Sequence, residues 1–136
     1  MTTAETTPTL FYEGDGRTRV GMSVSRIGED LIICLFNDAG HIGAVAVADY
    51  SETENRASVS VITRFGHKED KLASDTAGSL CKAIRRPVCV IAGIHLDGIT
   101  EEEIAEILEN CKNIVGVVRE PPTDGIRRGC LCGFIA

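Results

Sequence analysis

The hydrophobic pattern of this chain changes its period about halfway along, and that change limits the folds open to it. Between Thr18 and Thr63, apolar residues alternate with polar ones or form short continuous runs, which is typical of β-strands. Between Glu69 and Arg85, apolar residues recur every three or four positions, as they do on one face of an α-helix. A run of strands followed by a helix predicts an α+β fold, in which helices pack on a mostly antiparallel sheet.

The expected elements follow the order β-β-β-β-α-β-α, with about five strands and two packed helices. The expected strands are 18–26, 31–36, 42–48, 57–63 and 88–94, and the expected helices are 69–85 and a second one starting at Thr100. Pro87 ends the first helix, because the residue before a proline disfavours helical backbone angles. Thr100 and Glu103 have the spacing of a capping box. The continuous apolar runs 31–36 and 88–94 predict strands covered on both faces.

Composition places the chain among proteins with one core of their own. Of its 136 residues, 43% are apolar and 25% are charged, so we expect one domain over 10–118, a flexible leader over 1–9 and a proline-containing connector with an apolar tail over 119–136. The formal net charge of -6 argues against a nucleic-acid partner. No apolar run approaches the roughly 20 residues of a membrane span, and the first ten residues lack the pattern of a secretion signal. We therefore expect a cytoplasmic protein that contacts no membrane.

The cysteines predict packing rather than a metal site or a disulfide framework. Cys34, Cys81, Cys89 and Cys111 lie within apolar patterns, where a free cysteine behaves as a small hydrophobic residue. Cys130 and Cys132 form a C-x-C pair near the end of the chain, and no C-x-x-C pair completes a four-cysteine zinc site. Their role stays open.

The three histidines share a setting that points to a binding site. His41, His67 and His95 each lie beside or close to a glycine at the edge of an expected strand. Loops at strand ends are where a scaffold usually presents its working groups, and glycine lets the backbone approach a ligand closely. A single histidine of this kind more often forms a hydrogen bond to a turn. Three histidines in similar settings also fit a second interpretation, in which their loops share one pocket.

The segment Gly66–Lys68 stands directly before the first expected helix and suggests an anion site. Backbone N–H groups, the helix dipole and the Lys68 charge are together able to hold a phosphate. The segment lacks the G-x-x-x-x-G-K-[ST] pattern of a P-loop, and no G-x-G-x-x-G follows a strand. The acidic Glu69 and Asp70 offer the competing interpretation, since they already satisfy the dipole in the first helical turn.

A metal-dependent enzyme is the alternative. Three histidines with Asp97 are able to bind zinc and leave one position open for water, although no H-x-x-x-H or H-x-H pair supports such a site. Nucleophilic catalysis has less support, because no G-x-S-x-G occurs and the cysteines lie mostly in apolar surroundings that disfavour a thiolate.

Three ordered strings of the sequence resemble those of a known family. They are His41–Ala46, Gly66–Asp70 and Ala92–Thr100, and in this order and spacing they look like the small accessory subunit of gallate-decarboxylase systems, the prenylated-flavin chaperone-like family. The resemblance covers about Arg17 to Ile114. That domain is similar in fold to proteasome assembly chaperones, which are compact α+β units that tend to pair.

The resemblance implies a non-catalytic helper that binds or delivers a phosphorylated flavin, prenylated FMN or FMN, or that supports a partner decarboxylase. It also implies a homodimer, for which the half-buried strand 18–26 gives a separate reason. A pure protein-assembly module without a ligand is the third hypothesis. The ligand-binding residues that we expect are the three histidines with neighbouring glycines and charges: His41, Gly43, Gly66, His67, Lys68, His95 and Asp97.

Overall fold

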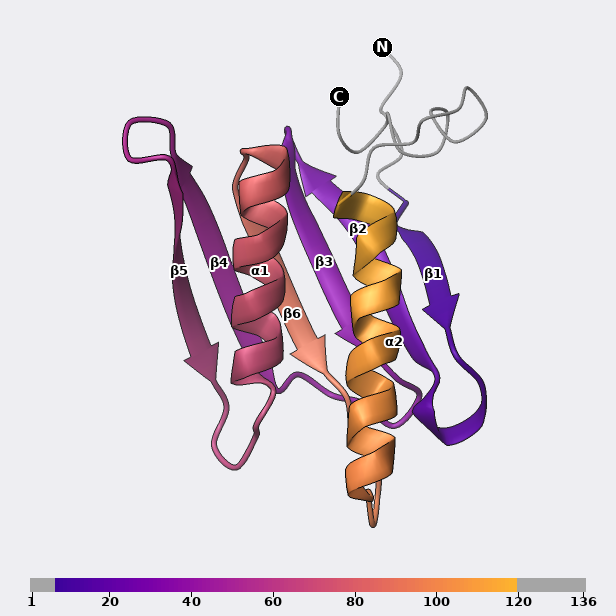
Figure 1. Cartoon of the computed structure of the whole chain (residues 1–136). Helices are drawn as coiled ribbons and strands as arrows, with labels where there is room; N and C mark the ends of the chain where they lie inside the picture. Colours follow the sequence, from indigo (N-terminus) through magenta and orange to yellow (C-terminus); the bar gives the residue numbers. More distant parts are fainter. Residues whose placement is uncertain (1–6, 120–136) are drawn as a thin grey trace.

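The alternating segments of the sequence form one six-stranded sheet, and two helices cover one of its faces in the computed structural model, which describes residues 7–119 (Figure 1). The strands are β1 (Thr9–Glu13), β2 (Val20–Ile27), β3 (Asp30–Phe36), β4 (Ala44–Ser51), β5 (Arg56–Thr63) and β6 (Val88–Gly93). The helices are α1 (Asp70–Ile84), α2 (Glu101–Arg119) and the short 3-10 helix η1 (Gly16–Thr18). The predicted α+β class is confirmed.

Two features of the sheet differ from the expectation. The strand β1 precedes the first expected strand and pairs antiparallel with β2, which gives six strands instead of about five. The spatial order is β1-β2-β3-β6-β4-β5, so β6 lies between β3 and β4 and runs parallel to β3. The other neighbouring pairs are antiparallel. The sheet is therefore mostly antiparallel but is not a simple meander.

Local sequence signals set the ends of several elements. Gly28, with φ of +60°, occupies the two-residue loop that joins β2 to β3, a position where a hairpin turn favours glycine. Arg85 adopts the left-handed conformation after α1, and its N–H donates to the carbonyl of Cys81 at 2.8 Å. The expected capping box of α2 is confirmed, because Thr100 Oγ1 accepts from the Glu103 N–H and Glu103 Oε1 accepts from the Thr100 N–H, both at 3.1 Å.

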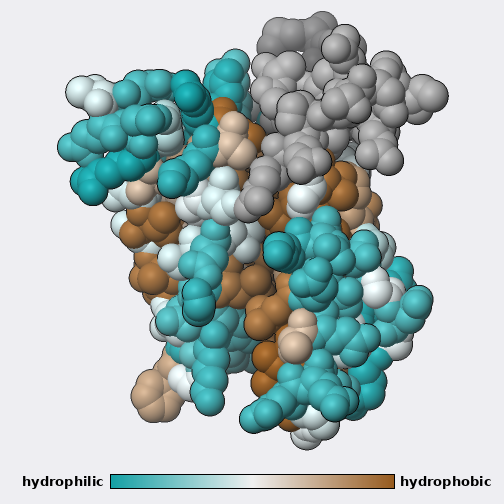
Figure 2. Space-filling view, in the orientation of Figure 1, coloured by the Kyte–Doolittle hydropathy of each residue, from teal (hydrophilic) through white to brown (hydrophobic). Residues whose placement is uncertain are grey.

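The core lies between the helices and the face of the sheet that they cover, and Figure 2 shows apolar residues between the hydrophilic outer surfaces of the two helices. Large buried side chains come from β2, β3, β6, α1 and α2, whereas β4 contributes only alanines, which let α1 lie close to the sheet. The core side chains from the sheet are Val20, Met22, Val24, Leu31, Ile33, Leu35, Ala44, Ala46, Ala48, Val88, Val90 and Ala92.

The opposite face of the sheet, which we call the open face, is not covered by either helix. The strand registers place there the residues that alternate with the core set, and they include Ile32, Phe36, Val47, Ile62 and Ile91. The prediction that 31–36 and 88–94 are covered on both faces was therefore wrong within the described chain. The alternate residues of both runs are only half-buried, except Gly93, which is buried against the 40–41 loop.

The same geometry corrects the interpretation of two cysteines. Cys81 and Cys111 are buried as expected, and burial raises the pKa of the Cys111 thiol to about 12. Cys34 and Cys89 are only partly buried and lie on the open face, not between sheet and helices. Cys130 and Cys132, together with the connector, lie outside the described residues, as does most of the expected leader. Within residues 7–119, no helix combines the length and apolar character needed to cross a bilayer.

Backbone contact at Gly93 joins β6 to the loop between β3 and β4. A Cβ atom at Gly93 would lie 2.0 Å from the carbonyl oxygen of His41, and one at Gly40 would lie 2.0 Å from the carbonyl oxygen of Gly93. The N–H of Gly43 donates to the carbonyl of Ala92 at 2.9 Å at the same place. Side chains at these glycines would force the two segments apart.

We expect Gly93→Ala to lower the free energy of unfolding by about 2 to 3 kcal/mol, because its methyl group meets backbone that has little room to move. The measurement is urea unfolding followed by circular dichroism. Gly116→Ala is the matched control, because a Cβ there meets nothing within 4 Å and alanine is favoured inside a helix by about 0.5 to 1 kcal/mol. Equal stability of the two variants would contradict the close approach at Gly93.

Candidate functional site

One end of the sheet collects the loops that carry the histidines. β6 runs parallel to β3 and antiparallel to β4. The last residues of β3, β5 and β6 and the first residues of β4 therefore all lie at the same end of the sheet (Figure 1). The loops 37–43, 64–69 and 94–100 are therefore neighbours, although they are far apart in the sequence.

The three imidazole rings form a cluster. The ring of His41 lies between the other two, with its centroid 4.7 Å from that of His67 and 5.8 Å from that of His95. The first pair meets edge to face and the second is stacked. His41 and His95 are exposed, and His67 is half-buried. The structure thus brings together the three histidines that the sequence singled out.

Each outer histidine has an acidic neighbour. His95 Nε2 lies 2.9 Å from Asp97 Oδ1, which is hydrogen-bond distance, and the Asp97 carboxylate is almost fully exposed. His67 Nδ1 lies 3.6 Å from Glu69 Oε2, too far for a good hydrogen bond, and both side chains keep a small exposed fraction, 17% and 15%. A hydrogen bond to Asp97 therefore orients the ring of His95, whereas Glu69 only lies near the ring of His67.

Glu69 occupies the position where the sequence suggested a free anion site. It stands at the N-cap of α1, and its Oε2 accepts from the backbone N–H of Lys68 at 3.0 Å. The N–H of His67 is also engaged, because it donates to the carbonyl of Arg64 at 3.1 Å. The backbone at 67–68 is therefore already bonded, and the Lys68 side chain, on an exposed residue, is what this segment offers an anion.

The two glycines of the expected site serve the chain itself in this structure. Gly43 is buried, and a Cβ there would lie 2.3 Å from the Glu69 carboxylate, so the missing side chain makes room for Glu69. Gly66 has φ of +79° with open space around it, so its role is the left-handed turn before α1.

Two residues that the sequence did not single out hold the His95 loop. Asn37 pairs with the backbone of His95 twice, donating from Nδ2 to its carbonyl at 2.8 Å and accepting from its N–H at 3.1 Å. Arg17 donates to the carbonyl of Asp97 at 2.9 Å and pairs with Glu103 at 2.8 Å. The sequence offered no signal for Arg17, and Asn37 appeared only as part of a loop of turn-forming residues.

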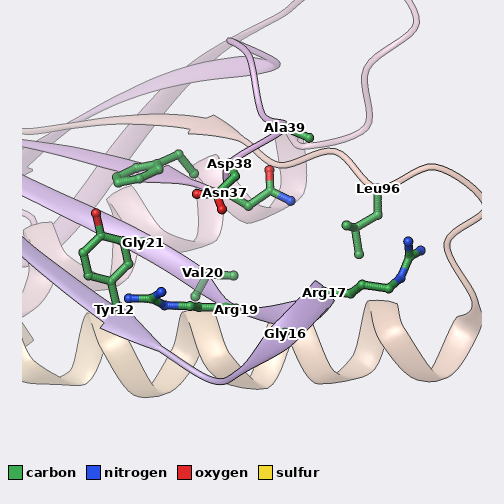
Figure 3. Close-up of a pocket in the computed structure, with 11 residues that line it drawn as sticks. Tyr12, Gly16, Arg17, Arg19, Val20, Gly21, Asn37, Asp38, Ala39 and Leu96 are labelled. Carbon is green, nitrogen blue, oxygen red and sulfur yellow. The ribbon is translucent and has the colours of Figure 1, made fainter.

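A pocket of about 310 Å³ adjoins this loop (Figure 3). It opens between the end of β1, η1, the start of β2 and the 37–39 loop, and Leu96 closes one side. Its lining residues are Tyr12, Gly16, Arg17, Arg19, Val20, Gly21, Phe36, Asn37, Asp38, Ala39 and Leu96. None of the seven expected ligand-binding residues lines it, so it is a second feature beside the histidine cluster.

A zinc site, the alternative hypothesis, needs at least three ligand side chains directed at one point. Among residues 7–119, no group of three or more His, Cys, Asp and Glu side chains is arranged to hold a metal ion. The ring contacts of His41 are those of packed imidazoles, one edge to face and one stacked.

Comparison with known proteins identifies the family. The model of the prenylated flavin chaperone LpdD-like domain matches residues 14–120, which is most of the chain. The chain belongs to this LpdD-like family. The resemblance seen in the three sequence strings is thereby confirmed. A non-catalytic accessory role agrees with the chaperone description of the LpdD-like domain.

Among solved structures, the LpdD-like domain is similar to a chain of a chaperone complex for yeast 20S proteasome assembly. The two are 12% identical with a TM-score of 0.48, and the match covers 81% of this chain and 94% of the other. None of the curated proteins compared with the chain matches it significantly.

The Arg17–Glu103 pair makes a prediction about acid stability. The hydrogen bond from Arg17, followed by those from Thr100, lowers the pKa of Glu103 below its ordinary 4.5. A lowered pKa gives stability that is present above the unfolded value and is lost as the pH falls through the folded one. We therefore expect Glu103→Gln to be less stable than wild type at pH 7 and to approach it as the pH falls below about 4.5.

Urea unfolding at a series of pH values measures this difference. Glu106→Gln is the control, because it removes an exposed carboxylate from the same helix. A stability deficit of Glu103→Gln that stays constant from neutral to acidic pH would show that the charge of Glu103 does not contribute.

Proposed function

We propose that the protein is a non-catalytic accessory protein that binds a phosphorylated flavin, prenylated FMN or FMN, and supplies it to a partner decarboxylase. The observation that carries the proposal is the convergence of His41, His67 and His95 from three separate loops onto one surface. Membership of the LpdD-like family supports the choice of ligand. The cytoplasm is the compartment that we propose, and the four free cysteines of the described chain agree with it.

The proposed contacts follow from the groups that the surface presents. The Lys68 ammonium would hold the phosphate, and the imidazoles of His41 and His67 would donate hydrogen bonds to the phosphate or to a ring carbonyl. Asp97 would keep the ring of His95 oriented. Glu69 limits the phosphate to the outer side of the cluster, because its carboxylate would repel an anion placed at the helix N-terminus.

Binding of flavin mononucleotide, its prenylated form and inorganic phosphate is measured by calorimetry on wild type and on Lys68→Ala. We expect both flavins to bind, and we expect the variant to lose about 10- to 100-fold in affinity, the usual effect of removing one charge-assisted contact. Lys71→Ala is the matched control, since its ammonium lies one turn further along and pairs with Asp75 at 2.6 Å. It should bind as wild type does.

Other outcomes would favour the other hypotheses. Equal binding by Lys68→Ala and wild type would remove the phosphate role of Lys68. A stoichiometric metal in the purified protein that is lost in His95→Ala would favour the metal-dependent enzyme. Absence of binding by all three ligands, with a protein partner recovered in a pull-down, would favour the pure assembly module.

We also propose that two copies of the chain pair through the open face. Among the strand residues that the structure describes, those in the middle of this face carry no charge: Ser23, Ser25, Ile32, Cys34, Val45, Val47, Ser60, Ile62, Cys89 and Ile91. Two copies with a formal charge of -6 each repel, so a neutral surface is the one on which they can meet.

The size of the face is sufficient for such a pair. Six strands spaced about 4.8 Å apart, with lengths of about 17 to 26 Å, give a face of about 600 Å² per copy. Two such faces together reach about 1,200 Å², the lower end of a stable protein interface.

We expect light scattering at micromolar concentration to give the mass of a dimer for wild type and that of a single chain for Val47→Glu. A carboxylate at this half-exposed position would have to lose its water inside the interface. Val117→Glu on α2, at a similar exposure of 42% against 50%, is the control and should stay dimeric. A wild-type protein with single-chain mass would reject the pairing.

A further inference from the structure

The pocket beside the histidine cluster has walls that suit an aromatic ring. A Cβ at Gly21 would lie 2.6 Å from the ring of Phe36 and 3.0 Å from the ring of Tyr12, so glycine there lets both rings lean over the strand. The two rings meet edge to face, with centroids 6.2 Å apart. Ring faces and edges offered in this way bind other aromatic groups.

The charge of the pocket suits an anion. Its lining carries the guanidinium groups of Arg17 and Arg19 against the single carboxylate of Asp38, which gives one net positive charge on a chain whose formal charge is -6. The two guanidinium groups differ in what they contact. Arg17 is bonded to Glu103 and to the Asp97 carbonyl, whereas Arg19 stacks on the ring of Tyr12 at 4.3 Å.

The contact with the Tyr12 ring places the Arg19 guanidinium at the pocket wall, where its N–H groups can reach a ligand. Such a planar fork is suited to bind a carboxylate or a phosphate with two parallel hydrogen bonds. Figure 3 shows the Arg19 side chain running alongside Tyr12, with Asn37 on the other side of the pocket. Asn37 is already bonded to the His95 backbone and Arg17 to Glu103, so Arg19 is the group of the lining that we expect to hold an anion.

Size then limits the ligand. A cavity of about 150 Å³ is enough to hold benzene. This pocket, at about 310 Å³, has room for one substituted ring with an acidic group. We propose that it binds a monocyclic aromatic anion, with the ring against Tyr12 and Phe36 and the carboxylate or phosphate on Arg19.

This site is separate from the one proposed for flavin. It uses Tyr12 of β1, Phe36 of β3 and Arg19, which lies between η1 and β2, whereas the flavin proposal uses the histidines and Lys68. The two proposals are therefore tested with different variants, and the failure of one leaves the other standing.

In the test, the protein is titrated separately with 4-hydroxybenzoate, phenyl phosphate and cyclohexanecarboxylate. Binding is measured by calorimetry and by the shift of the NMR signal of the Gly21 amide. We expect at least one of the two aromatic ligands to saturate the protein and shift this signal, and cyclohexanecarboxylate to bind at least tenfold more weakly. The ligand that binds better tells a carboxylate source from a phosphate ester.

Arg19→Gln should weaken binding of the aromatic anion at least tenfold while leaving the melting temperature unchanged, because Arg19 is exposed. Arg56→Gln is the matched control, at the other end of the sheet in an exposed pair with Glu54, and Lys68→Ala is a second control. Both should bind as wild type does. Failure of both aromatic ligands to saturate, or equal binding by Arg19→Gln and wild type, would overturn the proposal.

Discussion

The contact of bare backbone between Gly93 and the 40–41 loop is the constraint on which the functional end of this molecule depends. The strand β6 runs parallel to β3 and ends at Gly93, next to the loop that follows β3. Gly93 has no side chain, so its backbone lies directly against the carbonyl of His41. A larger residue would push the loop away from the sheet. The position of His41, and with it the ring contacts to both other histidines, therefore rests on the absence of a side chain.

Around that contact, the chain fixes its loops mainly through backbone groups. Asn37 holds the His95 loop by its main chain, Arg17 holds the Asp97 carbonyl, and the Glu69 carboxylate takes the Lys68 N–H. The imidazole rings are left on the outside of these anchors, where two of the three are exposed. A surface built in this way presents polar rings on a rigid frame, which suits recognition of a ligand more than covalent chemistry.

Local signals in the sequence were sufficient for the helices and for most of the strands. The first helix was expected over 69–85 and is found over 70–84, and the capping box at Thr100 is present. The insertion of β6 between β3 and β4 was not predictable, because parallel pairing joins distant segments and leaves no periodicity of its own. For the same reason, the sequence pointed to the three histidines but not to Arg17 or to the pocket, whose walls come from four separate segments.

The continuous apolar runs 31–36 and 88–94 have a different meaning from the one their pattern suggested. A run of this kind predicts that both faces of a strand are covered, but it does not say by which chain. Here the helices cover one face only, and the half-buried Ile32, Ile91 and Cys34 remain on the other. The pattern is explained if the second layer is a second copy of the sheet, since sheets packed face to face exclude water from both inner faces. At the end of that face, where the rings of Tyr12 and Phe36 lie over Gly21, the apolar surface continues into the pocket.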